Sequence, residues 1–213
     1  MFEINKAELV NIDKDFDSAV ERVCKLFMEG KIFVYPTDTL YGFGANPFND
    51  DAVMKISRIK SREEGKMYIL LINNIKNLSH YVNVQSEKHW DFLLSLWPNP
   101  VSVVLKLNSR TRNILGIEIA AFRIPNHRFC QKILDRIQMP LISTSVNRSN
   151  KPPLREFSEI RDEFSGDVDG IFYTEKRSFF EASTLLDLTG EEPVLLREGK
   201  IKFSDILPLL GKN

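Results

Sequence analysis

Hydroxyl side chains and two cations stand close together in the first third of the chain. The stretch from Tyr35 to Gly44 reads YPTDTLYGFG, and Lys60-Ser61-Arg62 follows it. Hydroxyls, backbone N–H groups freed at a turn and a pair of cations suit a small molecule that carries phosphate or carboxylate groups. The same residue types are ordinary in a turn between a strand and a helix. This stretch alone therefore leaves both interpretations open.

Four further polar clusters flank apolar runs later in the chain. Each cluster by itself is typical of turn hydrogen bonds or of a surface ion pair. Together with the first stretch they place four cations near strand or helix ends, where open α/β sheets tend to bind ligands. Such a set favours phosphoryl or nucleotidyl transfer that works by positioning and charge neutralisation. The clusters are Arg123 with Pro125 and His127, Ser143-Thr144-Ser145-Val146-Asn147, Ser183-Thr184, and Arg197-Glu198-Gly199, and the cations are Lys60, Arg62, Arg123 and Arg197.

Composition narrows the class of protein. The chain has 213 residues, of which 43% are hydrophobic, enough for one large domain with its own core. Lys+Arg and Asp+Glu both number 29, and this zero net charge disfavours a surface that binds nucleic acid or membrane all over. We expect no membrane contact and a cytoplasmic location, because no apolar run is long enough to span a bilayer and no signal peptide is visible.

The sequence also lacks several common catalytic signatures. Walker A, G-x-S-x-G and H-E-x-x-H motifs are all missing. Cys24 and Cys130 are isolated, which indicates free thiols in a reducing compartment. The histidines share no metal-site spacing, so the sequence predicts no metal site built from protein side chains.

Hydrophobic periodicity predicts strands and helices that alternate along the chain. The pattern indicates one α/β domain over residues 1–213, with a twisted, mixed sheet flanked by helices. Helices are expected over 15–29 with Gly30 as the stop, from an N-cap at Asp50 or Asp51 to 59, over 86–96, over 128–137 behind Asn126 as N-cap, and over 204–210. Strands are expected over 31–35, 68–72, 101–107, 119–124, 140–143, 170–173, 184–187 and 194–196.

These motifs resemble those of the YrdC-like threonylcarbamoyl-AMP synthases, in their short single-domain form. The resemblance covers roughly residues 19–201 and implies a twisted α/β fold with a concave, basic cavity. It implies that L-threonine, bicarbonate or CO2, and ATP with Mg²⁺ give threonylcarbamoyl-AMP and pyrophosphate. The product would pass to a tRNA threonylcarbamoyl transferase complex, which makes N6-threonylcarbamoyladenosine at position 37 of tRNA. The matching segments are YPTDTLYGFG (35–44), Lys60-x-Arg62, WPNP (97–100), RIPNH (123–127), STSVN (143–147), Ser183-Thr184 and LREG (196–199).

The resemblance also implies a role for each motif residue. Lys60 and Arg62 are implied to bind the ATP phosphates and to offset charge on the departing pyrophosphate, which makes them the catalytic pair. The further nucleotide contacts are Ser145, Asn147 and Arg197. The implied threonine-side residues are Thr37, Thr39, Tyr41, Arg123 on the carboxylate, Ser143 and Ser183.

The chain departs from the family pattern at several positions, and two other functions stay open. One is an RNA-binding module whose basic cavity holds tRNA or double-stranded RNA; the balanced charge disfavours it. The other is a paralogue that keeps the fold without efficient synthesis, which the intact Lys60-x-Arg62 pair disfavours. The departures are Lys66-Met67 before a strand, Leu71 where some members have histidine, Asn99 for glycine, Ile119 for a polar residue and Val146 for alanine.

Overall fold

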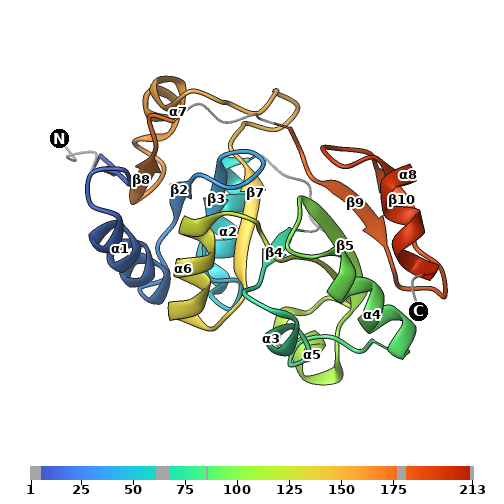
Figure 1. Ribbon diagram of the computed structural model, residues 1–213. Coiled ribbons are helices and arrows are strands. Elements are labelled where there is room, and N and C mark those ends of the chain that lie inside the picture. Colours follow the sequence, from blue (N-terminus) through green and yellow to red (C-terminus); the bar gives the residue numbers. More distant parts are fainter. Residues whose placement is uncertain (1–5, 61–67, 85, 177–180, 212–213) are drawn as a thin grey trace.

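The computed structural model describes residues 6–60, 68–84, 86–176 and 181–211 (Figure 1). Ten strands in these residues form one mixed sheet in the order β1-β8-β2-β3-β7-β4-β6-β5-β9-β10. The pairs β1–β8, β2–β8, β4–β6 and β5–β9 are parallel, and the others are antiparallel. The predicted α/β fold with a mixed sheet is confirmed. The strands are β1 (Glu8–Asn11), β2 (Phe33–Tyr35), β3 (Gly42–Gly44), β4 (Ile69–Leu71), β5 (Val101–Lys106), β6 (Ile119–Arg123), β7 (Leu141–Ser145), β8 (Gly170–Tyr173), β9 (Thr184–Asp187) and β10 (Val194–Arg197).

Two helices cover part of one face of the sheet. They are α1 (Phe16–Met28) and α6 (Arg128–Ile137), which lie side by side in Figure 1. Their apolar stripes share one core cluster with Phe33 and Tyr35 of β2. The rings of Phe16 and Phe129 join the two helices edge to face, with centroids 5.7 Å apart. Gly30 ends the α1 region with a positive φ of 67°, as the sequence predicts.

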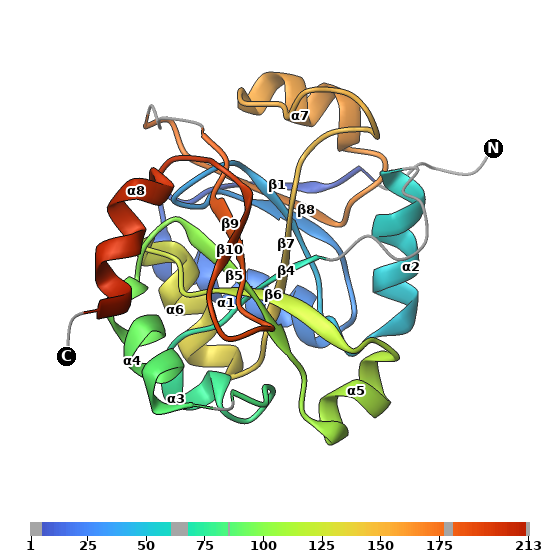
Figure 2. The ribbon, with the colours of Figure 1, turned by 90° about the vertical axis from the view of Figure 1, so that its right-hand side faces the viewer.

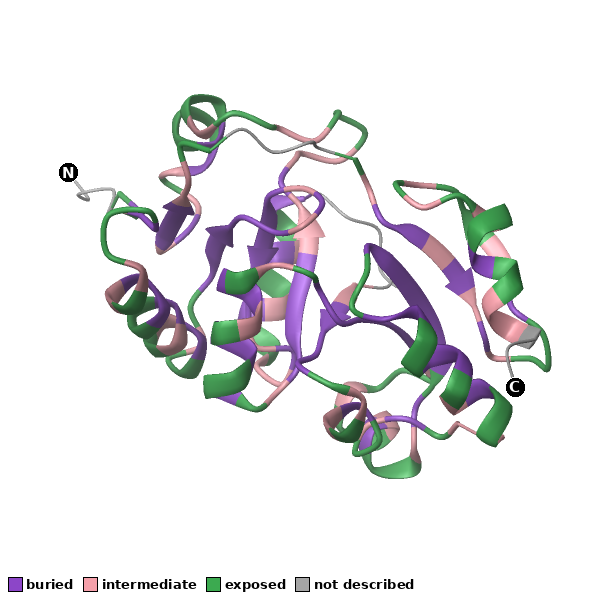
Figure 3. Cartoon of the chain, in the orientation of Figure 1, coloured by how far each residue is buried: buried purple, intermediate pink, exposed green. Residues whose placement is uncertain are grey.

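The opposite face packs against α2 (Asp50–Ile59), α4 (Glu87–Leu96) and α7 (Phe157–Phe164). Its core includes Phe43 and Phe164, whose rings meet edge to face at 5.0 Å. Figure 2 shows α2 and α7 from a second side, and Figure 3 shows that the strands between the helices are largely buried. Within the described residues no helix is long and apolar enough to cross a membrane. The shorter helices are α3 (Ile75–Leu78), α5 (Ser109–Leu115), α8 (Phe203–Ile206) and the 3₁₀ helix over Leu207–Gly211.

Helix ends differ from the sequence prediction in three places. The N-cap of α2 is Asn49, whose side chain accepts from Ala52 N at 2.9 Å, and the two aspartates after it lie in the first helical turn. The N-cap of α6 is His127, which makes no side-chain cap bond, and the N–H of Asn126 donates to Asp38. The last predicted helix is an α-helix only to Ile206 and then tightens to a 3₁₀ helix.

The sequence prediction also missed β3, which separates β2 from β7. Its residues Gly42-Phe43-Gly44 are typical of a turn, because glycine has low β propensity. The structure shows why glycine stands there. A Cβ on Gly44 would lie 2.4 Å from the ring of Phe33, and one on Gly42 would lie 3.0 Å from Ser143 Oγ. The elements β1, α3, α5 and α7 were likewise not predicted from the sequence.

Candidate functional site

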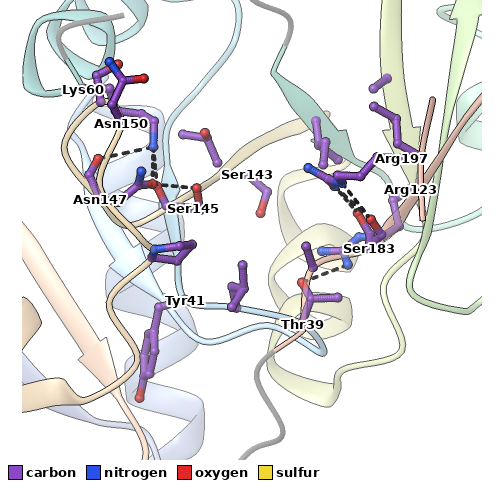
Figure 4. A pocket seen from close by; sticks show the side chains of 18 residues that line it. Thr39, Tyr41, Lys60, Arg123, Ser143, Ser145, Asn147, Asn150, Ser183 and Arg197 are labelled. Atoms are coloured by element: carbon purple, nitrogen blue, oxygen red, sulfur yellow. Dashed lines mark hydrogen bonds between the residues drawn. The ribbon is translucent and has the colours of Figure 1, made fainter. Parts of the chain in front are cut away.

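A cavity of about 430 Å³ lies over one face of the central strands (Figure 4). Its floor contains Ala121 and Arg123 of β6 and Ser143 and Ser145 of β7, each pair two residues apart and so on one face of the sheet. Ile69 of β4 lies between these strands, paired with Ala121 and Ser143. The cavity therefore lies on a sheet face. Arg123 and Ser145 are the last residues of β6 and β7, so these polar side chains do lie at strand ends, as expected from the sequence.

The same face is apolar where α6 covers it. Leu71 and Leu141 are fully buried there, in the core cluster that includes α6. Further along the same face of β7, the side chains after Leu141 are the small and polar Ser143 and Ser145. The cavity begins at these two serines. Leu71 pairs in register with Arg123, so this departure from the family pattern lies beside the cavity. Ile119 pairs with Lys106 and does not line the cavity.

One end of the cavity is built around Lys60, the C-cap of α2. Lys60 is buried, and its ammonium donates to Ser145 O at 2.5 Å and to Asn147 Oδ1 at 2.8 Å. The Ser145 hydroxyl donates to the same Asn147 Oδ1 at 2.7 Å. The structure thus brings together Lys60, Ser145 and Asn147, as the resemblance implies. Arg62 lies outside the described residues.

Arg148 braces this end of the cavity, and sequence reasoning missed it. Its Nη1 donates at 3.1 Å to the carbonyl of Ile59, the residue before Lys60. Its Nε and Nη2 donate to Glu163 at 2.8 Å and Asp167 at 2.6 Å. Arg148 therefore ties the end of α2 to the loop after β7 and to the α7 region. Its position directly after Ser-x-Asn is the one signal in the sequence, and its partners are far away along the chain.

The opposite end holds two arginines. Arg123 donates from Nη1 to Thr39 Oγ1 at 3.0 Å and lies 3.3 Å from Asp38 Oδ1. Arg197 of β10 donates from Nη2 to Ser183 O at 2.8 Å. Burial, together with the positive charge of Arg123, lowers the pKa of Arg197. Figure 4 shows Arg197 with Arg123, Ser183 and Thr39, on the far side of the cavity from Lys60.

Two of the expected threonine-side residues make contacts within the protein. The Thr37 hydroxyl donates to Leu40 O at 2.7 Å and accepts from Thr39 N at 3.1 Å. Thr37 holds the turn and is not among the cavity-lining residues. Tyr41 lines the cavity, but its hydroxyl accepts from Thr174 N at 3.2 Å. Burial raises the pKa of Tyr41, so the phenol stays protonated near neutral pH.

The lining suits a ligand with an anionic group at each end. Lys60 marks one end, Arg123 and Arg197 mark the other, and hydroxyls such as Ser143 lie between them. None of the described lining residues is acidic. The described part of the chain also contains no group of three or more His, Cys, Asp or Glu residues that could hold a metal ion. A magnesium ion would fit here as part of the nucleotide substrate, held mainly by phosphate oxygens.

Comparison with known proteins gives a consistent set of relatives. The family model Sua5/YciO/YrdC, described as telomere recombination, matches residues 25–199. A Pyrococcus abyssi (strain GE5 / Orsay) protein named threonylcarbamoyl-AMP synthase is 27% identical over 207 residues, 96% of this chain and 61% of the relative. A Bacillus subtilis (strain 168) protein of the same name is 28% identical over 198 residues, 92% of this chain and 57% of the relative. The chain thus spans about three fifths of the length of these relatives.

Solved structures agree with the fold. The crystal structure of P. abyssi Sua5 complexed with L-threonine superposes with a TM-score of 0.86 at 26% identity, covering 96% of this chain and 61% of that one. Escherichia coli YciO superposes with a TM-score of 0.82 at 23% identity, covering 93% of this chain and 97% of that one. The likeness to YciO concerns the fold alone.

Proposed function

The chain belongs to the Sua5/YciO/YrdC family, and on this premise we propose that it is a threonylcarbamoyl-AMP synthase. It joins L-threonine, bicarbonate or CO2, and ATP into threonylcarbamoyl-AMP and pyrophosphate. The names of the two curated relatives and the threonine complex of P. abyssi Sua5 support this proposal. The observation that carries it is the cavity with a lysine at one end and two arginines at the other, joined by hydroxyls.

Each end of the cavity binds a different substrate. Lys60, held by Ser145 and Asn147, binds the phosphates of ATP, because a buried ammonium is a compact partner for phosphate oxygens. Arg123 binds the threonine carboxylate, since a guanidinium fork matches a carboxylate. The hydroxyls of Thr39, Ser143 and Ser183 suit the neutral parts of the amino acid.

The reaction is a transfer at the α-phosphorus. Threonine carbamate forms first, when the amine nitrogen bonds to the carbon of CO2 with loss of a proton, or to that of bicarbonate with loss of water. A carbamate oxygen then bonds to the α-phosphorus while the bond from that phosphorus to the bridging oxygen of pyrophosphate breaks. Lys60, with Arg62 and the Mg²⁺ that accompanies ATP, offsets the charge on the departing pyrophosphate.

The α-phosphorus must lie within reach of both ends, because it is the atom that the carbamate attacks. That requirement gives Arg197 a role. Although it lies beside Arg123, it contacts the nucleotide at the α-phosphate, where the two substrates meet. Aligning the two reactants in this way is the main source of catalysis in such a site, and no side chain has to act as a nucleophile.

The product would serve a later transfer to tRNA, by a tRNA threonylcarbamoyl transferase complex that makes N6-threonylcarbamoyladenosine. We place this activity in the cytoplasm. The two cysteines agree with a reducing compartment, since both are free thiols. Cys130 is fully buried, whereas Cys24 is only partly buried.

The test is pyrophosphate release from ATP with Mg²⁺ and bicarbonate, with and without L-threonine. The proposal predicts release that depends on threonine and on bicarbonate. A folded protein that binds ATP and releases no pyrophosphate with threonine would contradict it. Tight binding of tRNA or double-stranded RNA by such a protein would support the RNA-binding alternative, which the synthase names of the relatives disfavour.

A further inference from the structure

The arginine end of the cavity holds two cationic side chains and one buried carboxylate. Only 2% of the Arg123 side chain and 7% of the Asp38 side chain are exposed, and the ion pair joins Nη1 to Oδ1 at 3.3 Å. Arg197 lies close enough for Arg123 to lower its pKa. Among the described residues Arg197 has no carboxylate within ion-pair distance, and its guanidinium donates to the carbonyl and hydroxyl of Ser183.

The neighbouring titratable groups change the net charge of this end of the cavity little. Burial lowers the pKa of His127, so its ring is neutral near pH 7. The ammonium of Lys200 is exposed to solvent, and it donates to the main-chain carbonyl of Asp38 at 3.2 Å. The carboxylate of Glu198 accepts from the N–H of Phe203 at 3.1 Å. Arg123, Arg197 and Asp38 together therefore carry a net charge of about one positive unit.

Two buried atoms at this end have no hydrogen-bond partner within the described structure. They are Nε of Arg123, a donor, and Oδ1 of Asp38, an acceptor. Nearly all buried polar atoms of native proteins are hydrogen-bonded, so these two atoms need an explanation, although Oδ1 already faces Nη1 of Arg123 in the ion pair. Asp38 does not line the cavity, so its carboxylate acts on a bound ligand through its charge. The ammonium of an amino acid complements that charge, whereas phosphate does not.

We propose that Asp38 determines the specificity of this end, so that it favours a zwitterionic amino acid over phosphate-like dianions. The proposal rests on the proposed function, because it takes Arg123 as the site of the amino-acid carboxylate. Asp38 is well placed for this role. Its Oδ2 accepts from Asn126 N at 3.0 Å, which fixes the carboxylate, and the next residue, Thr39, lines the cavity.

The physical reason is charge matching. Without the carboxylate, two adjacent guanidinium groups in a half-enclosed cavity form a strong site for phosphate or sulfate. The second substrate of the reaction is itself a polyphosphate, so such a site would be blocked by ATP or by the pyrophosphate product. With the carboxylate in place, the net charge falls from about two positive units to about one, so a dianion is attracted less strongly and the ammonium of an amino acid is repelled less.

The test compares Asp38→Asn with wild type. Asparagine keeps the shape and an acceptor for the N–H of Asn126 but removes the charge. Sulfate is the probe, because it is a tetrahedral dianion that does not enter the pyrophosphate assay. The matched control is Asp187→Asn, which removes a carboxylate that accepts from Thr189 N at 2.8 Å and does not line the cavity.

In wild type and in Asp187→Asn, sulfate should compete with ATP and not with threonine. In Asp38→Asn, sulfate should also compete with threonine, with an inhibition constant at least about ten-fold lower than any threonine-competitive effect in wild type. Asp38→Glu, which restores the charge, should return to the wild-type pattern. An Asp38→Asn enzyme whose sulfate inhibition matches wild type would overturn the proposal. If this variant fails to fold, Asp38→Ser takes its place.

Calorimetric titration of sulfate into the same proteins without ATP separates the two proposals. Tighter sulfate binding to Asp38→Asn that threonine displaces supports the role of Asp38. Equal sulfate affinity of the variant and wild type refutes that role even if the enzyme is an active synthase. Wild type without threonine-dependent pyrophosphate release refutes the proposed function instead.

Discussion

Replacing Lys60 with methionine should lower kcat/KM for ATP by about a hundred-fold to a thousand-fold. Methionine keeps most of the apolar stem and removes the ammonium, which is buried and held by Ser145 O and Asn147 Oδ1. Two unit charges about 4 Å apart interact by about 4 kcal/mol at an effective dielectric constant of about 20. Because Lys60 is only 6% exposed, water screens this interaction little. A loss of about 3–4 kcal/mol then corresponds to the stated range.

The assay is initial-rate pyrophosphate release with ATP varied at saturating threonine and bicarbonate. The matched control is Lys55→Met on the same helix, whose ammonium is exposed and pairs with Asp169 at 3.4 Å. That surface pair is worth at most about 1 kcal/mol of stability, so the control should keep wild-type kinetics. The KM for threonine should change little in Lys60→Met. A folded Lys60→Met enzyme with kcat/KM for ATP within about three-fold of wild type would refute the assignment of this end to the phosphates.

Three further predictions concern Arg123, Arg148 and His127. Arg123→Lys keeps the positive charge but loses the guanidinium fork, so it should raise the KM for threonine about ten-fold or more. The KM for ATP should stay near wild type in the same pyrophosphate assay. Arg148→Gln should lower the free energy of unfolding by about 1–2 kcal/mol in urea denaturation, because it breaks two partly exposed ion pairs and the bond to Ile59 O; an unchanged midpoint would contradict this. Burial lowers the folded-state pKa of His127 below its usual 6.5, so the unfolded chain binds a proton first and the free energy of unfolding should fall as pH drops below about 6.5. His127→Gln should reduce that fall, and identical pH dependence in denaturation curves of the two proteins would show that His127 does not contribute.

Much of the sheet could be predicted from the sequence, because long apolar runs reveal buried strands directly. The runs around Val101 and Leu141 both form strands near the expected positions. Short or glycine-rich elements carry too little pattern. Gly42–Gly44 is typical of a turn and becomes a strand only because β2 and β7 lie on either side of it. Helix caps were the least predictable feature, since Asn49, Asp50 and Asp51 all suit an N-cap and the structure uses the first of them.

Many of the cavity-lining residues were named from the sequence, but only part of their grouping in space could be expected. The Ser-x-Asn element and Lys60 meet as the resemblance implies. Arg197 joins Arg123 at the opposite end, which follows from β10 pairing with β9 beside Ser183. Asp38 was overlooked because an aspartate in a Thr-Asp-Thr turn is ordinary. Its importance comes from an ion pair with Arg123, far away along the chain.

The identity of the product tests directly whether this chain is a threonylcarbamoyl-AMP synthase. The enzyme would be incubated with ATP, Mg²⁺, isotopically labelled bicarbonate and labelled L-threonine, and the nucleotide products analysed by mass spectrometry. The proposed reaction gives one AMP adduct that carries both labels, formed in step with pyrophosphate. An adduct without the bicarbonate label, or ATP turnover with no threonine-containing adduct, would contradict it.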